Sequence, residues 1–162
     1  MLAAPGHSAS DRSGWMWDLT IPGDHDFYIQ AATTAILVHN CDSPVYRVIR
    51  PDEDPKAGLY PKDPEANWSI DQHVRFGSDP DFQSQYISTT RSLSLARFWA
   101  SRTGNRIVAI DLSQVDGEVT DLSTYEGREY NLLDAKGRGY AMKSEEVLIQ
   151  GSIPPEAISD VP

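Results

Sequence analysis

The strongest structural signal in this sequence is Tyr86-Ile87-Ser88-Thr89-Thr90, which is soon followed by Leu95-Ala96-Arg97-Phe98-Trp99. Residues 82–88 alternate in character, which predicts a strand that ends in hydroxyl side chains. Ser92 predicts the N-cap of a helix over about residues 93–102, and Gly104 predicts its C-terminal stop. The apolar face of this helix is expected to hold Leu93, Ala96, Trp99 and Ala100.

The rest of the chain after residue 41 predicts a mixed α+β domain. A loop rich in Pro and Asp is expected at residues 51–64, a short helix at 66–74 and a turn at 77–81. Further strands are predicted at residues 46–49, 107–112, 117–121 and 147–150.

Three distant segments hold the residue types needed to break a nicotinamide glycosidic bond. Arg47 lies in an apolar, strand-like run, which would hold its guanidinium rigidly toward a phosphate or ribose oxygen. The hydroxyls of residues 88–90 can orient a substrate. Glu146 precedes the apolar run 147–149, where a carboxylate can face a developing oxocarbenium ion. Taken singly, each has an ordinary alternative: an edge-strand arginine, capping hydroxyls, or polar residues before a core strand.

In this order, the segments resemble the Arg-Ser-Glu class of ADP-ribosyltransferases, especially the bacterial toxin branch. That family also has its Arg first, its Ser-Thr strand end in the middle and its Glu late. The strand Ser144-Glu145-Glu146-Val147-Leu148-Ile149 is similar to the family's catalytic glutamate strand, and the resemblance covers residues 45–158. It implies an α+β fold with an ADP-ribosyltransferase-like split β-sheet core and flanking helices.

The resemblance also implies roles for individual residues, with NAD consumed as a substrate. Glu146, Arg47 and Ser88 would be catalytic. Glu146 is expected to stay ionised in a solvated or hydrogen-bonded setting. The residues expected to contact NAD are Arg47, Tyr46, Ser88, Thr89 and Thr90.

Two positions concern the ADP-ribose acceptor. Ser144 stands where the resembled family usually has Glu or Gln, so the acceptor stays open between a protein side chain, a nucleotide and water. NAD glycohydrolase activity is therefore the alternative function, and a noncatalytic interaction module is the alternative of another class. Tyr140 lies in a stretch, residues 136–140, that is expected to be flexible; it either recognises the acceptor or packs on the sheet edge.

Composition limits the remaining possibilities. The 162 residues suit one domain with a small appendage. The net charge of -10 disfavours binding to anionic membranes and to nucleic acid, although a nucleic-acid acceptor stays open because Arg91, Arg97, Arg102 and Arg106 are near each other in sequence. No His/Cys cluster has metal-ligand spacing, and no Gly-rich phosphate loop indicates a redox NAD site. Phe98 and Trp99 are expected in the core, and His73 is expected to be structural.

The first 40 residues have a different character. Short strands are predicted at residues 17–21 and 27–29, and an apolar run at 35–38 leads into His39-Asn40-Cys41. This segment resembles the last strands of a Hint domain, the self-processing module of inteins and of many polymorphic toxins. The resemblance implies a processing site at those three residues with cleavage after Asn40, whereas the simpler alternative is a polar strand end. The expected domains are therefore a Hint-type C-terminal fragment over 1–40 and the toxin domain over 41–162.

By these resemblances, the chain is expected to be an effector domain of a larger precursor that is exported or delivered and acts in the target-cell cytoplasm. A neutralising immunity protein and a macromolecular or small-molecule acceptor are the expected partners. Residues 1–13 do not have the pattern of a signal peptide. Cys41 is the only cysteine, so no intramolecular disulfide is possible.

Overall fold

The computed structural model describes residues 26–31, 34–39 and 44–161, and the chain divides into two compact units, Met1–Cys41 and Asp42–Pro162. In the first unit, the segments expected at 27–29 and 35–38 form an antiparallel hairpin of β1 (Asp26–Ala31) and β2 (Thr34–His39). The strand predicted at 17–21 and the residues Asn40 and Cys41 lie outside the described residues.

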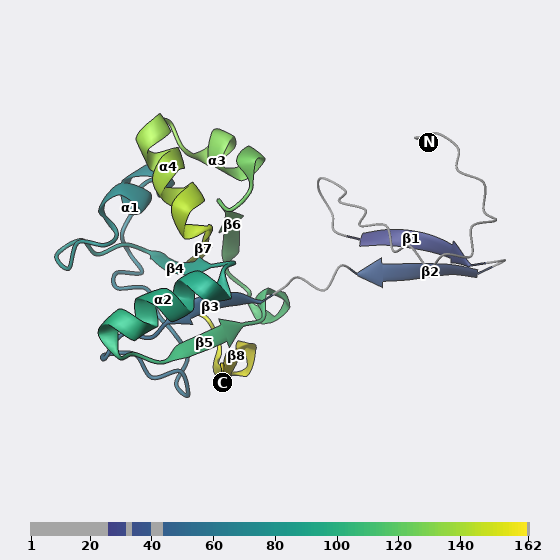
Figure 1. Ribbon diagram of the computed structural model, residues 1–162, viewed down its shortest axis with the longest axis horizontal. Coiled ribbons are helices and arrows are strands. Elements are labelled where there is room, and N and C mark those ends of the chain that lie inside the picture. Colours follow the sequence, from purple (N-terminus) through teal and green to yellow (C-terminus); the bar gives the residue numbers. More distant parts are fainter. Residues whose placement is uncertain (1–25, 32–33, 40–43, 162) are drawn as a thin grey trace. The chain divides into compact units, whose positions relative to one another are not determined.

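The second unit contains the elements that build the candidate site (Figure 1). Its strands are β3 (Val45–Val48), β4 (Tyr86–Thr90), β5 (Ile107–Ile110), β6 (Glu118–Asp121), β7 (Glu146–Gln150) and β8 (Ile158–Asp160). Its helices are α1 (Ile70–Phe76), α2 (Leu93–Thr103), α3 (Tyr125–Asn131) and α4 (Ala135–Ser144), with short 3₁₀ turns η1 (Leu112–Gln114) and η2 (Pro155–Ala157).

The strands form one sheet in the order β6-β7-β4-β3-β5-β8. All described pairings in this sheet are antiparallel. Its two central strands, β4 and β3, are joined by a single residue pair, Tyr46 opposite Thr90. The sheet is therefore nearly split into the halves β6-β7-β4 and β3-β5-β8. The mixed α+β fold expected from the sequence is confirmed.

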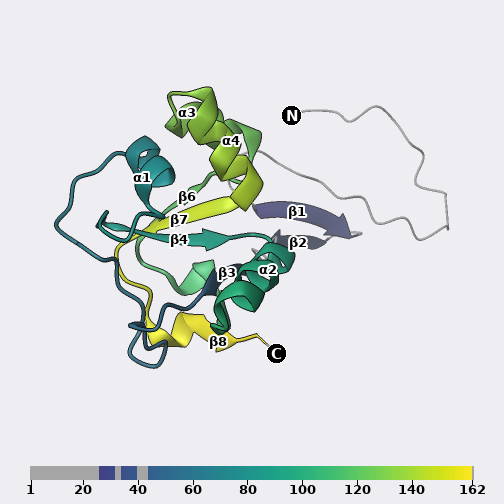
Figure 2. The same ribbon diagram turned by 60° about the vertical axis from the view of Figure 1, so that its left-hand side comes forward.

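Strand alternation divides the core into two clusters. On β7, Val147 and Ile149 belong to the larger cluster, and Leu148 between them belongs to the smaller one. Helices α3 and α4 pack against β6 and β7, α1 packs against α4, and α2 packs against β3, β4 and β5 (Figure 2). The sheet half that carries Glu146 is thus packed by α3 and α4, whereas α2 spans the split and contacts strands of both halves.

Helix α2 begins and ends where the sequence predicts. The Ser92 hydroxyl accepts a hydrogen bond from the Leu95 amide, and Gly104 adopts a left-handed conformation with φ 73°. Ala96 is buried on the expected apolar face. Phe98 was wrongly expected in the core: its position on the helix turns it outward, and 55% of it is exposed.

Two helix predictions need correction. Helix α1 begins at residue 70 rather than 66, because Ser69 and Gln72 form a capping box there. Residues 136–140, expected to be a flexible loop, belong to α4. The Asp134 carboxylate accepts from the Gly137 amide and starts this helix. A β-carbon at Gly137 would lie 3.1 Å from the Asp71 carboxylate, so this glycine allows α1 and α4 to approach closely.

Helix α4 ends at Ser144. Its C-cap, Glu145, adopts a left-handed conformation with φ 45°, which an L-residue other than glycine adopts only at a cost. Replacing the exposed Glu145 with glycine should therefore raise the free energy of unfolding by about 0.5–1 kcal/mol. Urea denaturation measures this change. The matched control is Lys143→Gly in the last turn of α4, which should lower stability by about 1 kcal/mol. Equal destabilisation by both substitutions would contradict the prediction.

Candidate active site

The strand register brings the predicted site residues together beside the split in the sheet. Thr90 pairs with Tyr46 on one side and with Glu146 on the other. Residues of β3, β4 and β7 therefore lie next to one another in a row across the sheet. A cavity of about 190 Å³ adjoins this row. Its lining residues are Tyr46, Arg47, Val48, Ser88, Thr89, Trp99, Ser144 and Glu146.

The Arg47 guanidinium bridges the split between the two halves of the sheet. Its Nη1 donates to the Ser88 carbonyl oxygen at 2.5 Å. Its Nε and Nη2 donate to the Glu53 carboxylate at 3.2 and 2.8 Å. The Glu53 side chain is only 4% exposed, and that of Arg47 is 10% exposed. All three guanidinium nitrogens are thus engaged within the protein, which fixes the rigid fork in place.

A chain of hydrogen bonds runs from α1 to the Ser88 hydroxyl. His73 Nδ1 lies 2.6 Å from Ser84 Oγ, and His73 Nε2 lies 2.8 Å from Ser88 Oγ. Burial lowers the pKa of His73 to about 4, and the positive charges of Arg47 and Lys62 add to this effect, so the imidazole is neutral at neutral pH.

The neutral imidazole implies one tautomer. The Ser88 hydroxyl hydrogen-bonds the Glu146 side chain. When Glu146 is ionised, Ser88 must donate to it, and its oxygen then accepts from Nε2–H of His73. Nδ1 is left as the acceptor of the Ser84 hydroxyl proton. The neutral histidine therefore orients Ser88 toward Glu146.

Burial raises the pKa of Glu146 to about 7, against the opposing hydrogen bonds from Ser88 and Ser144. The expectation of a Glu146 kept ionised by its surroundings is therefore corrected. The hydrogen bonds are present, but desolvation between β4, β7 and α4 outweighs them, so the carboxyl group is only partly ionised at pH 7.

The raised pKa predicts how Glu146→Gln changes stability with pH. Between pH 4.5 and 7 the Glu146 carboxyl group keeps its proton in the folded state but loses it in the unfolded state. The free energy of unfolding therefore falls as the pH rises through this range. The stability of Glu146→Gln relative to the native chain should therefore increase by about 3 kcal/mol from pH 4 to pH 8. Urea denaturation of both proteins at the two pH values measures this difference, and a pH-independent difference would contradict it.

The remaining predicted site residues lie around this centre in different ways. The hydroxyls of Thr89 and Thr90 donate to the carbonyl oxygens of Val147 and Ser144, both at 2.7 Å. These two bonds hold β4 against residues 144–147, the segment that contains Glu146. Ser144 lines the cavity, and its hydroxyl lies 3.5 Å from the Glu146 carboxylate. Tyr140 is 42% exposed on α4 and does not line this cavity.

Three residues of the site are not identified as site residues by the sequence: Glu53 and His73, which hold it together, and Trp99, which lines its cavity. Glu53 lies in a loop with several acidic residues, and nothing in its neighbours marks it as the partner of Arg47. His73 was expected to be an ordinary structural histidine, yet it contacts Ser88 directly. Trp99 was expected in the core and instead lines the cavity. Only the pairing of distant segments reveals these contacts.

Within the residues that the structure describes, no group of three or more His, Cys, Asp or Glu side chains is arranged to hold a metal ion. No helix in the same residues has the length and apolar character needed to cross a membrane.

Comparison with known proteins agrees with this architecture. A solved structure described as EcPltA is similar at 20% sequence identity and a TM-score of 0.51, over 74% of this chain and 83% of that one. The fold is accordingly ADP-ribosyltransferase-like. A search of curated proteins found no match. A family model described as "Domain of unknown function (DUF7587)" matches residues 47–161, which include every element from α1 to β8 and the residues Arg47, Ser88 and Glu146. Because this match spans most of the sequence, the chain belongs to the DUF7587 family.

Proposed function

We propose that this chain is a toxin-type ADP-ribosyltransferase that cleaves the bond between nicotinamide and ribose in NAD. The observation that carries the proposal is that one cavity is lined by Arg47, Ser88 and Glu146, which come from three neighbouring strands. The likeness to EcPltA supports the proposal at the level of the fold, which is ADP-ribosyltransferase-like.

In the proposed reaction, the nicotinamide ring occupies the part of the cavity that Tyr46 and Trp99 line. The bond between ribose C1′ and the ring nitrogen breaks, and its electron pair leaves with nicotinamide. The ionised Glu146 accepts a hydrogen bond from a ribose hydroxyl and stabilises the positive charge that develops on the ribose. An acceptor nucleophile then forms a bond to C1′ and loses its proton.

The surrounding hydrogen bonds support this role for Glu146. Ser88 donates to the carboxylate, and His73 holds the Ser88 hydroxyl from behind. Arg47 holds the backbone of the same strand through the Ser88 carbonyl. The carboxylate is therefore oriented before substrate binds, as preorganised electrostatic stabilisation requires.

One observation favours water as a second candidate acceptor. Ser144 lines the cavity where the resembled transferases usually have Glu or Gln, and its hydroxyl donates to the carbonyls of Tyr140 and Ala141 in its own helix. Nothing at this position supplies a carboxylate or amide to orient an acceptor side chain. NAD glycohydrolysis is therefore the alternative form of the proposed activity.

The test is nicotinamide release from NAD by the purified chain, with and without cell lysate. Rapid formation of free ADP-ribose from NAD alone supports hydrolysis, whereas slow release that accelerates with lysate supports transfer. Mass spectrometry of the lysate with isotope-labelled NAD then identifies the molecule that gains ADP-ribose. If neither condition releases nicotinamide above background, the noncatalytic alternative replaces this proposal.

A further inference from the structure

A second cavity adjoins the first and has a different chemical character. Its volume is about 360 Å³, and it shares Arg47 and Ser88 with the cavity of Glu146. The cationic side chains that line it are Arg47, Arg50 and Lys62. Phe82 and Tyr86 add aromatic surface, and His73 lies in the same wall. Such a combination suits a nucleotide, which presents both phosphates and a flat base.

The cations of this cavity differ in how far the protein already neutralises them. Arg47 is held by Glu53 and the Ser88 carbonyl. Arg50 pairs with Asp52 at 3.1 Å and with Glu53 at 3.2 Å. His73 is neutral at pH 7 because burial lowers its pKa to about 4. None of these groups offers an unshared positive charge.

Lys62 is the exception among the cations of this cavity. In the part of the chain that the structure describes, no carboxylate lies within ion-pair distance of its ammonium group. The group lies 3.5 Å from the carbonyl oxygens of Pro80 and Phe82, at the limit of hydrogen bonding. These neutral partners leave its charge available to an anion in the cavity.

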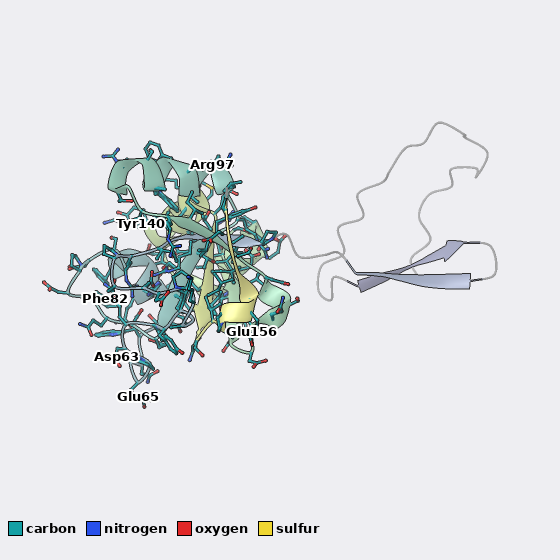
Figure 3. All side chains as sticks on the ribbon, turned by 90° about the horizontal axis from the view of Figure 1, so that it is seen from below. Asp63, Glu65, Phe82, Arg97, Tyr140 and Glu156 are labelled. Carbon is teal, nitrogen blue, oxygen red and sulfur yellow. The ribbon has the colours of Figure 1, made fainter. Side chains whose placement is uncertain are left out.

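The backbone around Lys62 is anchored, so the side chain starts from a defined place. Pro61 before it is buried, and the amide of Asp63 after it donates to the Ser84 carbonyl at 3.2 Å. Figure 3 shows Asp63 and Phe82 on the same side of the unit, away from Glu156. A loop held in this way loses less conformational freedom when it binds a ligand.

We infer that Lys62 is the residue that binds the diphosphate of NAD, while Arg47 acts as a brace of the site rather than as a phosphate ligand. The inference rests on the proposed function, because the anion is taken to be the remainder of an NAD molecule whose nicotinamide occupies the first cavity. The chain carries a net charge of -10, so an anionic dinucleotide needs a local unpaired cation. Lys62 supplies one beside the cavity of Glu146.

The direct test is binding of ADP, measured by titration calorimetry for the native chain and three variants. Lys62→Gln should weaken ADP binding about tenfold, as expected for one lost charge-assisted hydrogen bond. Lys62→Arg should stay within about threefold because it keeps the charge. Lys56→Gln is the matched control: it removes the same charge from an exposed lysine that lines neither cavity and should leave binding unchanged.

Salt dependence and kinetics add two readouts that a merely structural role would not change. ADP affinity should fall with salt for the native chain and Lys56→Gln, and less steeply for Lys62→Gln. With NAD, Lys62→Gln should raise KM about tenfold and leave kcat within about twofold, because the diphosphate lies away from the bond that breaks.

The outcomes separate this inference from the proposed function. If the native chain releases nicotinamide and Lys62→Gln keeps the native KM and ADP affinity, NAD cleavage stands and the role of Lys62 is overturned. If ADP binding depends on Lys62 but no NAD is cleaved, the nucleotide site stands and the proposed reaction fails. Absence of ADP binding by the native chain at millimolar concentration overturns the inference.

Discussion

Replacing Glu146 with glutamine is expected to reduce nicotinamide release from NAD by roughly a thousandfold. The amide keeps the size of the side chain and can still hydrogen-bond Ser88 and Ser144, but it carries no negative charge toward the developing oxocarbenium ion. Chromatographic measurement of released nicotinamide gives kcat and KM for both proteins. The loss should appear in kcat, because the electrostatic contribution arises in the transition state.

The matched control for this experiment is Glu145→Gln, at the adjacent and exposed residue. It removes the same charge from the same strand end and should keep activity within about threefold, as its side chain does not line the cavity. The thermal transition of Glu146→Gln shows whether the variant is folded. Native-like turnover in a folded Glu146→Gln protein would end the assignment of Glu146 as the catalytic carboxylate.

Removing Glu53 should have the largest effect on stability. Glu53→Ala is expected to lower the free energy of unfolding by about 3 kcal/mol, because it leaves the Arg47 guanidinium nearly buried and without its carboxylate. It also removes the acceptor of the Arg50 amide, which donates to Glu53 at 2.8 Å. Urea denaturation at pH 7 measures the loss.

Asp52→Ala provides the comparison for Glu53→Ala. Asp52 belongs to the same loop and pairs with Arg50, but its side chain is 69% exposed, so its removal should cost less than about 1 kcal/mol. The double variant Arg47→Met/Glu53→Leu removes both charges together and should be more stable than Glu53→Ala. Equal losses for Glu53→Ala and Asp52→Ala would show that the Arg47–Glu53 pair is not the support described above.

Local signals predict five of the six strands of the main sheet and one helix. The strand expected at residues 82–88 begins only at residue 86 and ends at residue 90, and β8 is not predicted. Helix α2 was placed correctly because its cap, its apolar spacing and its terminal glycine all lie within the same short segment. Helix α4 was missed because Gly137 and Gly139 weaken the local helix signal. Gly137 is instead needed for the close approach of α1, which is a contact between segments far apart in sequence.

For the site, the sequence predicts Arg47, Ser88 and Glu146 because their order and flanking residues resemble the Arg-Ser-Glu class of ADP-ribosyltransferases, whereas each residue taken singly has an ordinary alternative. Tertiary structure alone brought them to one cavity, joined His73 to Ser88 and Glu53 to Arg47, and left Lys62 without an ion-pair partner in the described residues. It also decided the pKa of Glu146. The physical reason is that desolvation and hydrogen-bond partners depend on which distant groups surround a side chain, and neighbours in sequence do not specify them.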